Sequence, residues 1–178
     1  MVIICDSREQ RCLSFDGLEG IEKIEEMGLS FGDYSAIVHG NPVPIVFERK
    51  GISDLFGTMT IGYERFKKEM QRAKESNMKL ILAVEGTYTD VYQGISHSQF
   101  SGQSMVKKLA MLQVKYDLET WYCESRRVMA RRIVDTFSAV ERCWAKESPN
   151  KITPNRASDV VRLSAPDASA LPEAQPEV

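Results

Sequence analysis

The sequence lacks several features that identify common classes of protein. No apolar stretch approaches the roughly 18 residues that a membrane-spanning helix needs, so no membrane span is expected. The first residues also lack the basic start and apolar middle of a signal peptide. Only two histidines are present, and no pair of cysteines has the Cys-x-x-Cys spacing, so a zinc site is not expected.

Two further shortages concern redox state and charge. The four cysteines are Cys5, Cys12, Cys123 and Cys143, and without a metal motif they are interpreted as free thiols in a reducing compartment. The net charge is only −2, so the chain is not a polycation. Any binding of nucleic acid must therefore use local basic patches.

Length and composition predict one domain followed by a tail. The 178 residues are 43% hydrophobic, which is enough for a buried core. Five of the seven prolines follow Trp144, the last aromatic residue, among alanine, serine and acidic residues. Such a composition cannot bury a core. We therefore predict a folded domain over residues 1–147 and a disordered tail over residues 148–178.

Apolar patterns predict alternating strands and helices. Strands are expected at residues 2–5, 34–39, 43–48, 78–84 and 119–123, and helices at residues 59–76, 103–116 and from Ser125, as the cap, through Trp144. Residues 15–26 are ambiguous, and we interpret them as a loop followed by an extended segment at 23–26. Residues 87–102, including His97, are polar and are predicted to be a loop. Helices between strands indicate an α/β sheet.

The predicted hairpin around residues 39–42 brings two acids together. Asp33 begins one strand and Glu48 ends the next, so antiparallel pairing places both at the same end of the sheet. Two adjacent carboxylates repel each other unless a cation neutralises them. Lys50 lies on the same side as Glu48, because side chains alternate along a strand. This arrangement predicts a divalent-metal site, and a solvated strand end is the alternative.

A second charged cluster lies at the start of the last predicted helix. It consists of Arg126, Arg127, Arg131 and Arg132. A solvated basic face and a surface for phosphate or for a partner are both compatible with this pattern.

Three ordered motifs resemble the nuclease domain of the XPF-type structure-specific endonucleases. They are Asp6-Ser7-Arg8-Glu9, Gly32-Asp33-Tyr34, and Glu48-Arg49-Lys50 followed after three residues by Asp54. The segments at 63–66 and 84–86 also stand where that family has them, and the resemblance covers about residues 1–145. It implies a restriction-endonuclease-like α/β core with a central mixed β-sheet flanked by helices.

The resemblance also implies a chemistry, namely cleavage of DNA by an endonuclease that depends on Mg²⁺ or Mn²⁺. By motif match, Asp33 and Glu48 would be metal ligands, with Asp6 as a third carboxylate. Lys50 would orient or activate the attacking water and stabilise charge in the transition state, and Arg49 would hold the site together or contact phosphate. The supporting site residues would be Arg8, Glu9, Asp54, Arg65 and Glu69.

The chain departs from the larger members of this family in one respect, and this limits what the resemblance implies about the substrate. The tail lacks the apolar residues for a helix-hairpin-helix module, so we expect a compact stand-alone nuclease. It would be cytoplasmic and nucleoid-associated, encoded by a bacterium or phage, and would act on branched or flap DNA in repair or recombination. A homodimer through the helices after Gln103 is expected, and no membrane contact.

Two other functions remain open at this point. One is a catalytically decayed DNA-binding or scaffold protein, although the intact set Asp6, Asp33, Glu48 and Lys50 argues against decay. The other is a nuclease that acts on single-stranded nucleic acid or RNA.

Overall fold

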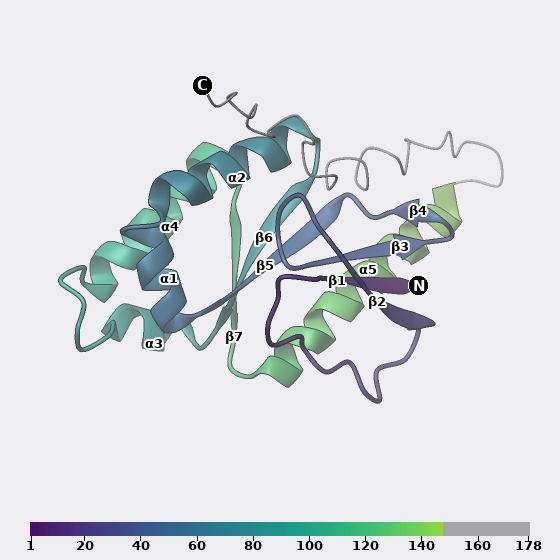
Figure 1. Ribbon diagram of the computed structural model, residues 1–178, viewed down its shortest axis with the longest axis horizontal. Coiled ribbons are helices and arrows are strands. Elements are labelled where there is room, and N and C mark those ends of the chain that lie inside the picture. Colours follow the sequence, from purple (N-terminus) through teal and green to yellow (C-terminus); the bar gives the residue numbers. More distant parts are fainter. Residues whose placement is uncertain (148–178) are drawn as a thin grey trace, which may run out of the picture.

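The computed structural model describes residues 1–147, and the predicted tail at 148–178 lies outside the described residues. Within residues 1–147 there are seven strands: β1 (Val2–Asp6), β2 (Lys23–Met27), β3 (Tyr34–Val38), β4 (Asn41–Pro42), β5 (Ile45–Gly51), β6 (Lys79–Glu85) and β7 (Glu119–Cys123). The helices of this part are α1 (Ile52–Met59), α2 (Tyr63–Glu75), α3 (Tyr88–Gln93), α4 (Gly102–Tyr116) and α5 (Arg126–Glu147), as Figure 1 shows.

The strands form one mixed sheet in the order β2-β1-β3-β5-β6-β7, with β4 paired to β3. β3 is antiparallel to both of its long neighbours, whereas β5, β6 and β7 are parallel to one another. The carboxyl ends of β1, β2, β5, β6 and β7 therefore meet the amino end of β3 at one edge. The prediction of a mixed sheet flanked by helices is confirmed.

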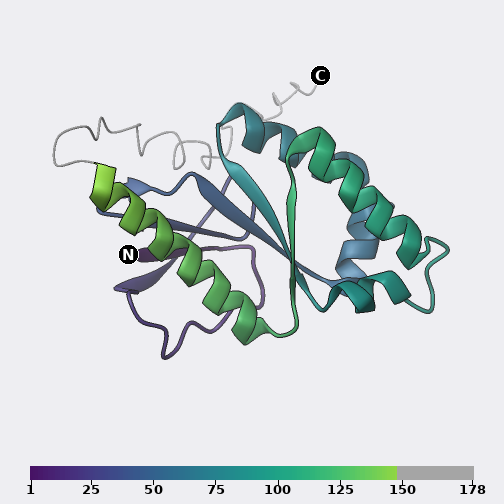
Figure 2. The same cartoon turned by 180° about the vertical axis from the view of Figure 1, so that it is seen from behind.

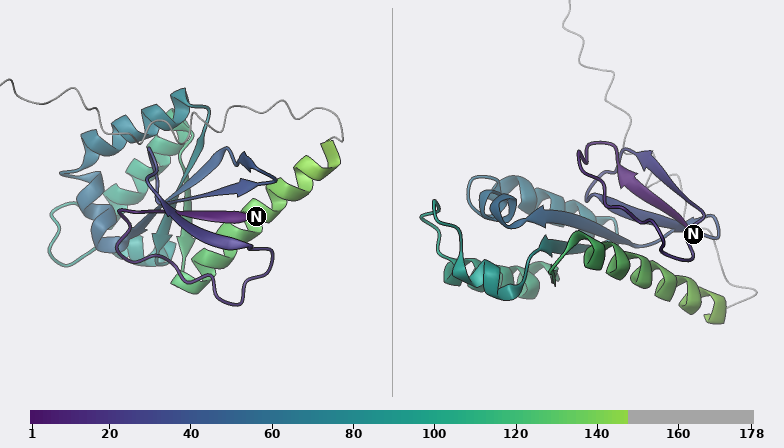
Figure 3. Two further views of the ribbon diagram at one scale, coloured as in Figure 1. Left: turned by 45° about the vertical axis from the view of Figure 1, so that its right-hand side comes forward. Right: turned by 90° about the horizontal axis from the view of Figure 1, so that it is seen from below.

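Each face of the sheet is covered by helices. On one face, α5 packs its Met129, Ile133 and Phe137 against β-strand residues that include Phe47, and Figure 2 shows this helix lying across the strands. On the other face, α1, α2 and α4 cover a second core, and the views in Figure 3 show α5 apart from these helices. Alternation along β5 then directs Arg49 to the α5 side, and Glu48 and Lys50 to the α2 side.

Two helical predictions differ from the structure. The helix expected at 59–76 begins later, as α2 at Tyr63, and Met59 instead ends the separate helix α1, because the chain turns at residues 60–62, where the amide of Gly62 donates to the Gly57 carbonyl at 3.0 Å. The loop expected at 87–102 contains α3, which a capping box between Thr87 and Asp90 starts. The hairpin, the extended segment near 23–26 and the Ser125 cap are confirmed.

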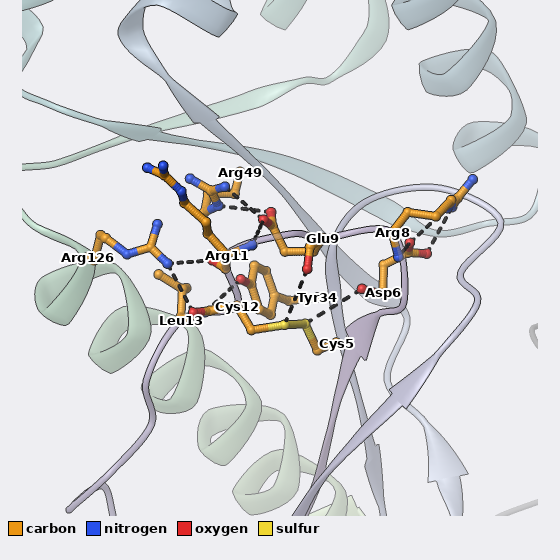
Figure 4. The surroundings of a disulfide bond; sticks show 10 residues. All are labelled: Cys5, Asp6, Arg8, Glu9, Arg11, Cys12, Leu13, Tyr34, Arg49 and Arg126. Carbon is orange, nitrogen blue, oxygen red and sulfur yellow. Dashed lines mark hydrogen bonds and ion pairs between the residues drawn. A yellow bond between two sulfur atoms is a disulfide. The ribbon is translucent and has the colours of Figure 1, made fainter.

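The prediction of four free thiols is wrong for two of them. Cys5, buried in β1, and Cys12, exposed in the following loop, form a disulfide, whose surroundings Figure 4 shows. The chain turns back just after β1, where the Glu9 amide donates to the Asp6 carbonyl at 2.9 Å, and this turn returns Cys12 to the strand. Among the described residues, Cys123 and Cys143 are free. No helix in this part of the chain is long and apolar enough to cross a membrane.

Candidate active site

A solvent-open cleft of about 880 Å³ lies at the sheet edge where the strand ends meet. Charged side chains from β1, β5, β6, α1, α2 and the start of α5 line it. The lining includes all ten residues that the sequence singled out: Asp6, Arg8, Glu9, Asp33, Glu48, Arg49, Lys50, Asp54, Arg65 and Glu69. The mixed topology gathers them, because β1 and β5 end at the edge where β3 begins, and α1 and α2 bring the remaining residues.

Asp33 and Glu48 both line the cleft, and they lie close enough for the charge of Asp33 to raise the pKa of Glu48. The Asp33 amide donates to the Phe47 carbonyl at 2.7 Å, so the first residue before β3 is held beside the end of β5. Gly32 makes this approach possible, because a Cβ there would lie 2.3 Å from a Val46 methyl carbon and the backbone has φ +70°. The amide of Gly32 also donates to Glu69 at 2.9 Å, which ties α2 to the same turn.

The two carboxylates are difficult to ionise together. Burial raises the pKa of Asp33 to about 6, although the Arg49 amide donates to its carboxylate at 2.7 Å. Glu48 is only 6% exposed, and burial together with the nearby charges of Asp33 and Glu69 raises its pKa to about 8. A positive charge beside both carboxylates would favour their ionised forms and so lower both pKa values.

Lys50 supplies one positive charge at this point. Its ammonium forms an ion pair with Glu48, two residues earlier on the same side of β5. Burial alone would lower the pKa of Lys50, but the attraction of Glu48 and Asp33 outweighs burial and the pKa is raised. Lys50 is therefore a cation at neutral pH.

Arg49 points to the opposite side of β5, where it links β5 to the loop after β1 and to the end of β6. Its guanidinium donates to both oxygens of Glu9 at 3.0 and 2.9 Å and to Glu85, at the end of β6, at 2.8 Å. Arg126, from the first turn of α5, donates to the same Glu85 oxygen at 2.6 Å. Of the two roles that the sequence left open for Arg49, this geometry favours the one of holding the site together.

Both carboxylate oxygens of Asp6 already accept hydrogen bonds. Arg8 donates to its two oxygens at 2.8 Å each, and the amides of Arg8 and Leu29 donate at 2.8 and 2.6 Å. Although burial opposes ionisation, these bonds lower the pKa of Asp6. Among residues 1–147, no three acidic, histidine or cysteine side chains form a metal-binding group. A ligand role for Asp6 therefore stays a prediction, and here it orders the loop after β1.

The remaining predicted residues line the walls of the cleft. Asp54 lies in the first turn of α1, and Arg65 and Glu69 lie on α2. Sequence reasoning did not assign Glu85, Arg126, Arg72 or Arg11 to this site. For Glu85 a signal existed, since it ends a strand parallel to β5. For Arg11 and Arg72 the sequence offered no comparable signal.

The donor set fits a hard divalent cation. Mg²⁺ is usually held by one or two carboxylates together with waters and substrate oxygens, and it does not require an all-protein cage. Asp33 and Glu48 provide two adjacent carboxylates in an open cleft, with raised pKa values that a cation would reverse. A cation bound here would lie beside Lys50, at the edge of the sheet where the strand ends meet.

Comparisons with known proteins give the family and the fold of the chain. The model of the ERCC4 domain family matches residues 5–135 of the chain. The structure is similar to that of XPF from Aeropyrum pernix, with a TM-score of 0.61 and 22% identity over 88% of this chain and 67% of that one. It is also similar to XPF from Aeropyrum pernix in complex with DNA, with a TM-score of 0.59 and 22% identity over 85% and 68% of the two chains.

No curated protein sequence matches the chain significantly. The family match spans most of the chain, from Cys5 in β1 to Asp135 in α5, and includes every candidate site residue. The chain therefore belongs to the ERCC4 domain family, and its XPF-type nuclease fold is established.

Proposed function

We propose that this protein is an endonuclease that hydrolyses phosphodiester bonds in DNA and depends on Mg²⁺ or Mn²⁺. The observation that carries the proposal is the pair Asp33 and Glu48 beside Lys50 in an open cleft. Membership of the ERCC4 domain family and likeness to an XPF structure in complex with DNA support it. The alternative of a decayed protein loses weight, because Asp33, Glu48 and Lys50 are all present and all line the cleft.

The carboxylates of Asp33 and Glu48 would hold the cation. When bound, it would supply Lewis-acid stabilisation of the phosphoryl oxygens and lower the pKa of a water molecule. Glu69, whose carboxylate is bonded to the Gly32 amide, stands close enough to raise the pKa of Glu48 and adds negative charge to the same place. The pair thus favours a cation over a neutral ligand.

Lys50 would act as an ammonium. Its raised pKa makes it a poor proton acceptor, so its role would be to hold the attacking water and to offset negative charge on the reacting phosphate. Arg49 would act from the far side of β5, since its bonds to Glu9 and Glu85 fix the strand that carries both Glu48 and Lys50.

We propose branched or flap DNA as the substrate, in repair or recombination, and a homodimer as the active form. On α4, Met111 is 49% and Val114 is 90% exposed, and these apolar side chains form the surface that we assign to the second copy. Residues three apart on a helix are neighbours on its surface, so these two can form part of a protein interface.

The test is cleavage by purified protein of duplex, flap, fork and single-stranded DNA and of RNA, with Mg²⁺, Mn²⁺ or EDTA. We expect Asp33→Asn and Glu48→Gln each to lower the rate by at least about two orders of magnitude, because each removes an anionic metal ligand. Asp135→Asn, an exposed acid on α5, is the matched control. Full activity of either site variant, or in EDTA, would contradict the proposal, and cleavage of RNA alone would change the substrate.

A further inference from the structure

Arg11 lies on a loop whose backbone is fixed at several points. The loop leaves β1 at Asp6 and is closed by the Cys5–Cys12 disulfide, which Figure 4 shows. The Arg11 amide donates to Glu9 at 2.8 Å, and Glu9 is itself held by Arg49. From the other side, Arg126 donates to the Arg11 carbonyl. The backbone at Arg11 is thus held by a covalent bond at the next residue and by two charged side chains.

The side chain of Arg11, in contrast, is free. Within the described part of the chain its guanidinium has no hydrogen-bond or ion-pair partner, and the residue is exposed. Figure 4 shows the side chain extending away from the disulfide, with no interaction drawn to its guanidinium. The neighbouring arginines differ, because Arg8, Arg49 and Arg126 are all paired with carboxylates. The fixed loop thus presents one uncommitted cation at the mouth of the cleft.

Two similar cations line the cleft from the other face of the sheet. Arg65 and Arg72 are seven residues apart on α2, so they lie two turns apart on one side of the helix, with Glu69 between them. Both are exposed, and neither guanidinium has a partner among residues 1–147. α2 covers one face of the sheet, whereas the loop of Arg11 is bonded to α5, which covers the other.

The cleft therefore has free cations from both faces of the sheet, and the acids Asp33 and Glu48 line the same cleft. This distribution is complementary to a polyanion whose central phosphate reaches the acids through a cation, and whose flanking phosphates reach the walls. Arginine suits such contacts, because its planar guanidinium can donate two parallel bonds to one phosphate. A fixed backbone adds to the contact, because less freedom is lost when the phosphate binds.

We propose that Arg11 binds a backbone phosphate on one side of the bond that is cut, and that Arg72 binds one on the other side. This inference rests on the proposed function and names the contacts that would hold the strand across the cleft. Both residues bind substrate without taking part in the reaction. They are expected to bind nucleic acid of any base sequence, because contacts to phosphate do not distinguish between bases.

The experiment is fluorescence anisotropy of a labelled flap DNA in Ca²⁺ over a series of salt concentrations. Each phosphate contact contributes about one to the slope of log affinity against log salt, so Arg11→Gln and Arg72→Gln should each reduce the slope by about one, and the double variant by about two. Arg11→Lys should retain the slope. Arg142→Gln, an exposed arginine on α5 that does not line the cleft, should match the wild type.

Kinetics separate a substrate contact from a structural role. Loss of a contact that is made equally in the bound and transition states raises KM and leaves kcat unchanged. If Arg11→Gln binds with the wild-type slope, or lowers kcat alone, the inference is wrong while the proposed function stands. If the wild type does not bind the DNA, the proposed function fails, and the inference fails with it.

Discussion

At the scale of single residues, Lys50 and Glu48 form one ion pair but should respond differently to substitution. Lys50→Ala removes a cation from beside two carboxylates, so affinity for Mg²⁺ or Mn²⁺ should hold or rise slightly. Cleavage should nevertheless fall by about two to four orders of magnitude, because the ammonium stabilises charge in the transition state. Glu48→Gln, in contrast, should lose both metal binding and cleavage.

The measurement for Lys50 is calorimetric titration with Mn²⁺ beside single-turnover cleavage. Lys68→Ala, an exposed lysine on α2 that does not line the cleft, is the matched control and should behave as the wild type. Normal cleavage by Lys50→Ala would contradict the role that we assign to this residue. Loss of metal binding equal to that of Glu48→Gln would contradict it as well.

At the scale of elements, α4 exposes two large apolar side chains, Met111 and Val114. Val114→Asp should weaken a homodimer at least about tenfold, because a charge would be buried where an apolar side chain is now 90% exposed in the single chain. Ile61→Asp is the control, since Ile61 is 99% exposed in the turn between α1 and α2. Sedimentation velocity over a concentration series gives the association state. A monomeric wild type would contradict the proposed assembly.

The elements that sequence could predict are those with a strong apolar pattern. The hairpin of β3 and β5 was predictable because turn residues separate two apolar runs, and it brought Asp33 to Glu48 correctly. The division into α1 and α2 was not, since Met59 fits the spacing of the helix that follows and only the local contact of Gly62 with Gly57 ends the first helix. α3 is short, and its one clear signal was the Thr87–Asp90 capping box.

At the scale of the whole molecule, stability without a cation should depend on pH in an unusual direction. Asp33 and Glu48 have pKa values of about 6 and about 8, both above their ordinary values of 3.8 and 4.5. At pH values between the ordinary and the raised pKa values of these groups, the folded state therefore binds more protons than the unfolded state. The free energy of unfolding falls as pH rises through this window.

Mg²⁺ should reverse that trend, because it binds the deprotonated pair. The increase in melting temperature with Mg²⁺ should be larger near about pH 8 than near about pH 5.5, since cation binding to the folded state must displace protons at the lower pH. The double variant Asp33→Asn/Glu48→Gln should lose both the pH dependence and the Mg²⁺ effect, and Asp135→Asn should keep them. An equal Mg²⁺ effect at the two pH values would show that other groups bind the cation.

The cleft as a whole shows where sequence reasoning stops. Motifs indicated the acids and the lysine, because Asp33 precedes β3 while Glu48 and Lys50 lie near the end of β5, at the same edge of the sheet. The network of Arg49 with Glu9, Glu85 and Arg126 depends on the packing of α5 against the sheet, which no local pattern specifies. The same is true of the disulfide between Cys5 and Cys12. It depends on the turn after β1, which brings Cys12 back beside Cys5 in the folded chain.

That disulfide also makes assay chemistry part of the biochemistry of this protein. The dithiols that are routinely added to storage buffers would convert Cys5 and Cys12 to thiols, and the loop that carries Glu9 and Arg11 would then be closed only by noncovalent contacts. Preparations made with and without reductant are thus two different samples of the same polypeptide. Their activities and melting temperatures should be reported separately, and the thiol content of each preparation should be determined before the two are compared.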